Sequence, residues 1–207
     1  MNQITLSENV MVSDPCYSLD TWCQTKLSNV LPGKYNVEID KTDLGDWGNR
    51  ISSITAIHEN YQDDYGSWIQ HSDCGVDSGQ CGIFCMTSYR NDEMSEGITT
   101  PPLDRPFVIP FNQEGDVWYD KMCNFTLSGE GWGLYDTGAV SSSGIGDGMY
   151  PLEVMMDNDK VVGIKVVFLG DDDEDDYEDE GDCCGVCGGE LESDGECVYC
   201  CEEKTED

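Results

Sequence analysis

The sequence predicts a mostly β protein, with a compact antiparallel sandwich or barrel-like body followed by a small C-terminal zinc ribbon or knuckle. Three observations predict this class. Several segments alternate apolar and polar residues with a period of two, 23 glycines interrupt the chain, and four cysteines near its end form two C-x-x-C pairs. Changes in composition indicate a globular domain at 1–169, an acidic linker at 170–182 and a cysteine tail at 183–207.

The strongest strand predictions come from the alternating segments. Residues 34–40 place apolar side chains on one face and polar side chains on the other, which is typical of a half-buried strand. Residues 51–58 predict a second strand. Residues 152–156 and 162–168 alternate on either side of a turn and predict a hairpin. Because the second arm of this hairpin is apolar on both faces, we expect it to lie in the middle of a sheet.

Other segments give less regular patterns. Residues 18–26 predict one or two helical turns, with a serine as the N-terminal cap. Residues 75–85 predict a glycine-rich strand that lets a ligand or another backbone approach closely. Residues 117–127 and 131–135 are rich in aromatic side chains and predict short strands. Residues 99–110 contain four of the seven prolines and predict an irregular loop.

The chain carries a net charge of −33, and residues 170–207 hold 18 of its acidic residues against one lysine. Such a chain repels phosphates, so we expect no direct binding of nucleic acid. We also expect no membrane span, because no stretch approaches the roughly 18–20 apolar residues that a span needs. The first twelve residues have no basic start or apolar core of a secretion signal, which favours a cytoplasmic location.

The cysteine tail predicts a zinc site. Cys184 and Cys187 form one C-x-x-C pair, and Cys197 and Cys200 form the second. Two such turns supply the four thiolates of a tetrahedral structural zinc, with no open position for water. An iron–sulfur cluster or a disordered thiol-rich tail is the alternative. The neighbouring thiols are candidates to replace a ligand at either end: Cys183 and Cys201.

Four polar residues of the body are candidates for a ligand-binding site: Asp14, Asp77, Gln80 and Asp147. Each lies in a predicted turn or in the glycine-rich strand, where small neighbours leave room for a ligand. The alternative is that these side chains cap their own turns.

A hydrolase is a second interpretation of the body. Cys16 follows a carboxylate in a turn, and with His58 it would make a nucleophilic pair. Asp77 and Asp147 would instead form a catalytic carboxylate site, either alone or with a bound metal. A buried cysteine with a purely structural role is the alternative for Cys16.

Four segments of the body together resemble the signature segments of a bacterial and phage family, domain-of-unknown-function family four-two-four-one, and related phage proteins. They are residues 12–17, 47–50, 76–84 and 142–150. The resemblance covers most of 1–169 and stops at the acidic linker. It implies a compact β-rich domain from a phage or a bacterium, and hence host cytoplasm if the source is a phage. It implies no reaction and no catalytic residues, and the cysteine tail departs from the family's plain domain.

The resulting functional prediction is a non-enzymatic binding protein with a structural zinc site. Its partner is a protein or a small molecule that the sequence does not name. The hydrolase is one alternative. A second is an acidic decoy that occupies the basic groove of a nucleic-acid-binding host protein, because a dense acidic surface resembles a phosphate backbone.

Overall fold

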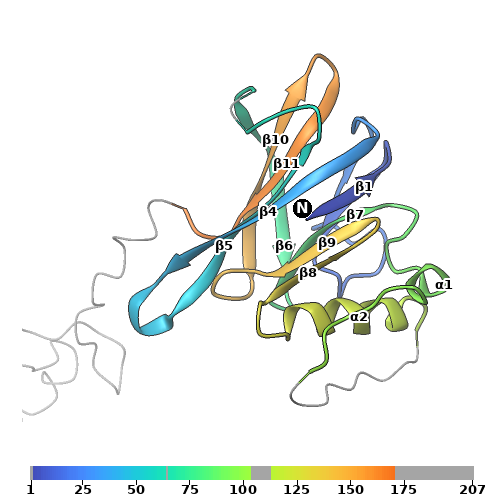
Figure 1. Ribbon diagram of the computed structural model, residues 1–207, viewed down its shortest axis with the longest axis vertical. Coiled ribbons are helices and arrows are strands. Elements are labelled where there is room, and N and C mark those ends of the chain that lie inside the picture. The colour runs from blue at the N-terminus through green and yellow to red at the C-terminus, as the bar shows by residue number, and fades with distance from the viewer. Residues whose placement is uncertain (1, 64, 104–112, 171–207) are drawn as a thin grey trace, which may run out of the picture. The chain divides into compact units, whose positions relative to one another are not determined.

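The computed structural model describes residues 2–63, 65–103 and 113–170, and Figure 1 shows how their elements are arranged. One compact unit of the chain spans Met1–Leu169. All but the first residue of the predicted acidic linker, and the whole cysteine tail, lie outside the described residues. The domain boundaries and the zinc site therefore stay predictions.

The described body is mostly antiparallel β structure in two open sheets, which confirms the predicted class at that level. The six-stranded sheet has the order β1 (Gln3–Leu6), β4 (Gly33–Asp43), β5 (Asn49–His58), β11 (Lys160–Val167), β10 (Gly148–Asp157) and β6 (Trp68–Val76). The five-stranded sheet has the order β3 (Thr25–Leu27), β2 (Val10–Ser13), β7 (Gln80–Cys85), β9 (Gly138–Ser142) and β8 (Trp132–Tyr135).

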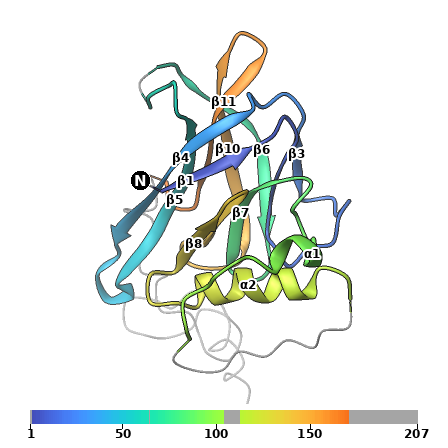
Figure 2. The ribbon, with the colours of Figure 1, turned by 45° about the vertical axis from the view of Figure 1, so that its right-hand side comes forward.

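Two hydrophobic clusters hold these elements together. The larger cluster takes buried side chains from both sheets, among them Ile54, Ile83 and Ile164. The smaller cluster joins the other face of the five-stranded sheet to the helix α2 (Asp116–Thr126) through Phe84, Trp118 and related residues. Figure 2 shows α2 lying alongside the five-stranded sheet. The fold thus buries both faces of β7, and all six of its residues are buried.

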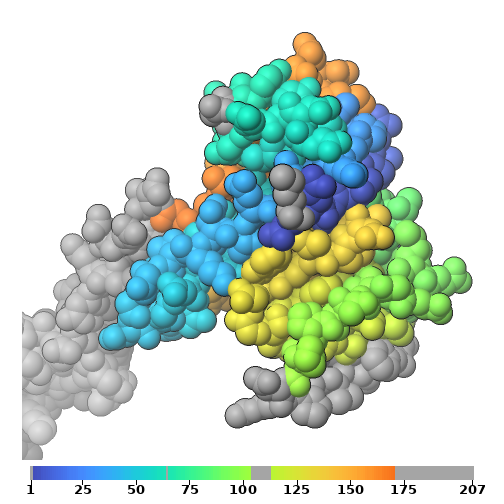
Figure 3. Space-filling view, viewed as in Figure 1, coloured from blue at the N-terminus to red at the C-terminus, as the bar shows by residue number. Residues whose placement is uncertain are grey.

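The alternating segments form the predicted strands. The segment at 34–40 lies inside β4, residues 51–58 lie in β5, and the predicted hairpin is the antiparallel pair of β10 and β11. β11 lies between β5 and β10, as its apolar faces predicted. On the face seen in Figure 3, the β4–β5 hairpin lies beside the β8–β9 hairpin, where Lys41 Nζ donates to the backbone oxygen of Glu130 (3.2 Å).

The strand predicted at 117–127 is wrong, because this segment is the helix α2. Trp118, Met122 and Phe125 recur at helical spacing and are buried, so packing against the sheet outweighs the strand preference of aromatic residues. The helix begins after Gly115, whose φ of 88° suits glycine. The carboxylate of Asp92, in the short helix α1 (Asp92–Ser95), accepts the N–H groups of Gly115 and Trp118 (both 2.9 Å).

The helical turns predicted at 18–26 are also wrong. The segment runs through bends and turns, and its last two residues begin β3. Pairing with β2 opposes a helix here, because Thr25 and Leu27 lie opposite Val12 and Val10. The 3-10 turn η1 (Gly45–Trp47), at the end of the β4–β5 hairpin, is another helical element that the sequence did not predict.

Candidate functional site

The glycine-rich segment at 75–85 is two strands joined by a tight turn, Asp77–Ser78–Gly79, which we call the β6–β7 turn. This turn connects the two sheets, since β6 is an edge strand of the six-stranded sheet and β7 is an inner strand of the five-stranded sheet. Gly79 has a φ of 67°, in the left-handed region that favours glycine. All four candidate site residues meet at this turn.

The carboxylate of Asp14 accepts hydrogen bonds from the β6–β7 turn. Its side chain is fully buried, and each carboxylate oxygen accepts two hydrogen bonds. Oδ2 accepts the N–H groups of Asp77 (2.9 Å) and Ser78 (2.7 Å), while Oδ1 accepts the Ser78 hydroxyl (2.7 Å) and the N–H of Cys16 (2.8 Å). A buried carboxylate needs such donors to offset its lost hydration. Only the bond from Cys16 caps the turn to which Asp14 itself belongs, and the other three hold the distant β6–β7 turn.

Asp147 holds the turn from a second side. Its Oδ1 accepts the N–H of Gly79 (3.1 Å), and the backbone oxygen of Gly79 accepts the N–H of Ser143 (3.0 Å). These bonds attach the loop that precedes β10 to the β6–β7 turn. The carboxylates of Asp77 and Asp147 are both exposed to solvent.

Gln80 faces α2 rather than the open side of the turn. Its side chain is buried, with Oε1 accepting the Thr126 hydroxyl (2.9 Å). Its Nε2 lies 3.3 Å from the Ser78 hydroxyl and 3.6 Å from the sulfur of Cys123. The amide thus joins the turn to the helix, and this role does not leave it free for a ligand in the surface pocket described next.

A pocket of about 560 Å³ opens beside the turn, and we call it the Asp77–Asp147 pocket. Its volume is in the range of small-molecule sites. The side chains that carry its chemistry are Tyr17, Trp22, Asp77, Asp147 and Met149. Trp22 is 85% exposed and Met149 is 51% exposed, so two large apolar side chains of the pocket are in contact with water. Asp14 and Gln80 do not line it.

Tyr17 couples the pocket to the turn. Burial, followed by hydrogen bonds to Cys23 and Asp77, raises the pKa of its phenol. A phenol is protonated at neutral pH in any case, and these interactions connect Tyr17 to Cys23 and to the carboxylate of Asp77. Sequence reasoning missed Tyr17 and Trp22, because the segment at 18–26 showed no sign of lying beside residues 75–77 and 147–149.

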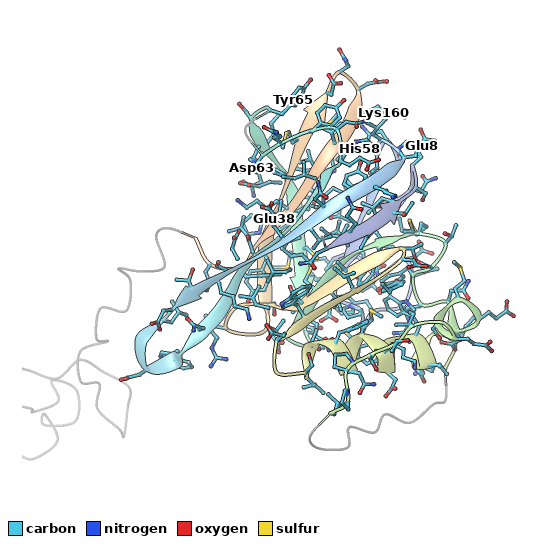
Figure 4. All side chains as sticks on the ribbon, viewed as in Figure 1. Glu8, Glu38, His58, Asp63, Tyr65 and Lys160 are labelled. Atoms are coloured by element: carbon cyan, nitrogen blue, oxygen red, sulfur yellow. The ribbon has the colours of Figure 1, made fainter. Side chains whose placement is uncertain are left out.

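The structure does not bring Cys16 and His58 together. Figure 4 shows His58 near Lys160 and Tyr65. That end of the six-stranded sheet contains the β10–β11 turn, because Asp157 pairs with Lys160. Cys16 is bonded at the other end of β10, where Gly148 pairs with Val76 beside the β6–β7 turn. β10 has ten residues, so its length of roughly 29–31 Å at 3.2–3.4 Å per residue separates the two ends.

The thiol of Cys16 is also chemically unsuited to nucleophilic attack. Burial, and then the negative charge of Asp14, raise its pKa. A thiol becomes a good nucleophile or metal ligand when its pKa falls and the thiolate forms. This environment works in the opposite direction.

Two further thiols meet in the core between the sheets. The sulfur atoms of Cys74 and Cys81 lie 3.6 Å apart and both side chains are fully buried. A hydrogen bond from Cys74, together with burial, raises the pKa of Cys81. Within residues 2–63, 65–103 and 113–170, no group of three or more His, Cys, Asp or Glu side chains is arranged to hold a metal.

Comparisons with known proteins give no relative: no family model, no curated protein and no solved structure matches this chain. The resemblance of the body to a phage and bacterial family therefore stays a prediction. Neither helix in the described ranges has the length and apolar character that crossing a membrane requires.

Proposed function

We propose that this chain is a non-enzymatic binding protein whose body holds a small ligand in the Asp77–Asp147 pocket. The observation that carries the proposal is the pairing of two exposed apolar side chains, Trp22 and Met149, with two carboxylates around one small-molecule-sized pocket. Large side chains exposed together at a concave surface are typical of binding sites.

The anchoring of the pocket supports this proposal. The β6–β7 turn is fixed by the buried carboxylate of Asp14 from one side and by Asp147 from another. Gln80 and Thr126 join the same turn to α2. The β6–β7 turn is thus ordered before a ligand binds, which reduces the entropy lost by this part of the pocket on binding.

The chemistry of the neighbouring groups favours binding over catalysis. Cys16 has a raised pKa and lies at the far end of the sheet from His58, so this pair offers no thiolate and base in contact. Asp14 uses both oxygens to hold the turn. These arrangements position a surface and do not activate a nucleophile.

The proposal keeps the predicted tail and source. Cys184, Cys187, Cys197 and Cys200 would hold a structural zinc, and the phage or bacterial family resemblance would place the protein in the cytoplasm of a bacterial cell. Both parts rest on the sequence alone.

Native mass spectrometry of the full chain, purified from the cells that produce it, tests the proposed function. We expect the wild-type protein to carry a small molecule and Trp22→Ala to lose it. Trp47→Ala is the matched control, because Trp47 is also exposed (60%) but lies at the end of the β4–β5 hairpin. A wild-type chain without any adduct, or the same adduct on all three proteins, would contradict the proposal.

A further inference from the structure

We propose that the ligand of the Asp77–Asp147 pocket is a small organic cation, with a primary ammonium group on an apolar body. The inference rests on the proposed function, because it names the ligand class of the same pocket. Three features of the pocket support it: its charge, its hydrogen-bonding groups and its exposed apolar side chains.

The pocket is negatively charged. Asp77 and Asp147 line it, and no Lys, Arg or His is among its lining residues in the described part of the chain. Lys26, three residues beyond the lining residue Cys23, is ion-paired with Asp20. Residues 1–169 hold 25 acidic residues against nine basic ones, so the whole body attracts cations and repels anions. An anionic ligand would meet this field without a compensating basic group in the pocket.

The hydrogen-bonding groups favour a ligand that donates. Two donors of the lining segments are already used within the protein: the Thr21 hydroxyl donates to the backbone oxygen of Ser18 (2.8 Å), and the N–H of Gly75 donates to the backbone oxygen of Cys23 (3.2 Å). A carboxylate accepts about four hydrogen bonds. Asp147 accepts a backbone N–H of the β6–β7 turn on Oδ1 and keeps acceptor capacity toward the pocket. A primary ammonium brings three donors and no acceptor.

The apolar part of the ligand would lie on Trp22 and Met149. An indole face attracts a cation more strongly than any other aromatic side chain, and the attraction acts within about 6 Å of the ring. Met149 is flexible and polarizable, so it adapts to an aliphatic or aromatic body. Trp22, at 85% exposure, has little packing in the protein to lose when it turns toward a ligand.

The size of the pocket favours a free molecule over a lysine presented by another protein. About 560 Å³ is enough to enclose a small ligand. A stable protein partner would need roughly 1,200–2,000 Å² of total buried surface.

Calorimetry of the full chain with three probes of nearly equal shape tests the inference. Phenethylamine is a cation at neutral pH, phenethyl alcohol is its neutral counterpart, and phenylacetate is an anion. We expect phenethylamine to bind about tenfold more tightly than the alcohol and phenylacetate not to bind. Added salt should lower the affinity for phenethylamine and leave the affinity for phenethyl alcohol unchanged.

Two variants with equal charge changes separate the pocket from the general field. Asp147→Asn keeps an oxygen that can accept the N–H of Gly79 but removes one negative charge from the pocket. It should therefore lower the affinity for phenethylamine several-fold and leave the affinity for phenethyl alcohol unchanged. Asp46→Asn changes an exposed carboxylate at the end of the β4–β5 hairpin and should leave both affinities unchanged. Melting curves of the two variants show that both remain folded.

The outcomes separate the two proposals. If the alcohol binds as tightly as the amine and Trp22→Ala abolishes both, the cation inference is overturned and the pocket remains a binding site. If the amine binds but Asp147→Asn and Asp46→Asn weaken it equally, the inference is also overturned, because only net charge matters. If none of the probes binds at millimolar concentration, the inference fails. If Nα-acetyl-lysine amide, whose side-chain ammonium is free, binds more tightly than phenethylamine, the inference is overturned, because the ligand is then a partner's lysine and not a free cation.

Discussion

Asp14 is fully buried, and its carboxylate accepts four hydrogen bonds from the β6–β7 turn and from Cys16. The backbone N–H of Asp77 donates to the Asp14 carboxylate (2.9 Å), yet the side chain of Asp77 is exposed and lines the pocket. The two residues look alike in the sequence, since each stands in a polar turn. What separates their roles is burial, which depends on how β2 and β7 pair.

Asp14→Ala should be strongly destabilising. The change leaves three donors of the β6–β7 turn and the N–H of Cys16, all partly buried, without their acceptor, and an unsatisfied buried group costs about 1–3 kcal/mol. We expect a loss of at least ~3 kcal/mol in the free energy of unfolding, measured by urea titration with tryptophan fluorescence. Asp46→Ala, an exposed carboxylate, should stay within about 0.5 kcal/mol. An Asp14→Ala protein as stable as this control would contradict the role given to Asp14.

Buried phenols predict a loss of stability at high pH. Burial raises the pKa of Tyr135 to about 12, and it also raises the pKa values of Tyr35, Tyr89 and Tyr119. The ordinary value is 10, so the folded state holds protons that the unfolded state has lost. Their contribution is complete below pH 10 and is lost as the pH rises toward 12 and above. Urea titrations across this range, with tyrosinate absorbance, check the prediction; stability that does not fall would contradict it.

At the scale of elements, the sequence was sufficient where one segment has one exposed and one buried face. Residues 34–40 alternate for this reason and form β4 as predicted. The β10–β11 hairpin was predicted from apolar residues on either side of a turn, and β11 is buried on both faces. The sequence was insufficient for α2, because Trp118, Met122 and Phe125 suit a strand by type and a helix by spacing. Packing against the five-stranded sheet favours the helix, and that packing is not local.

The pocket shows the same limit of local reasoning. Asp77 and Asp147 were candidates because each stands in a turn, and the structure places both at the β6–β7 turn. Trp22 and Tyr17 reach the pocket only because β3 pairs with β2, and this brings the connecting segment beside β6. No sequence pattern within residues 18–26 predicts the pairing of β3 with β2.

The start of α2 depends on a carboxylate outside the helix. Asp92 accepts the N–H groups of Gly115 and Trp118, which have no partner inside the first turn. Asp92→Ala should lower the free energy of unfolding by about 1–2 kcal/mol, as for loss of a helix cap. The neighbouring Glu93 is exposed, so Glu93→Ala should change the free energy of unfolding by less than about 0.5 kcal/mol. Thermal melts of both variants compare them, and equal melting would show that Asp92 does not stabilise the helix.

At the scale of the whole molecule, the acidic charge is divided between two parts of different character. Residues 170–207 hold 18 acidic residues and one lysine, while the folded body holds the basic residues that form its ion pairs, such as Arg90 with Asp116 (3.1 Å). An acidic decoy would bind through charge alone, and its partner would be lost steeply as salt rises. A pocket ligand with an apolar body would keep part of its affinity.

The cysteine tail predicts about one zinc per chain. Metal analysis of the purified full chain should find it, and Cys184→Ser combined with Cys187→Ser should remove it. A chain that ends at Leu169 provides the control without these cysteines. It should unfold within about 1 kcal/mol of the full protein, because the acidic run has too few apolar residues to pack. Equal zinc in all three proteins would contradict the assignment of the four ligands.

The central claim is that the Asp77–Asp147 pocket binds a small molecule. Chemical-shift mapping of the isotope-labelled full chain, with a fragment library balanced among cations, neutral molecules and anions, tests it most directly. The account predicts that the binders shift the Trp22 indole N–H and the amides of Asp77 and Asp147, and that Trp47 does not move. Binders that act only at other surfaces, or a library with no binder at this pocket, would contradict the claim.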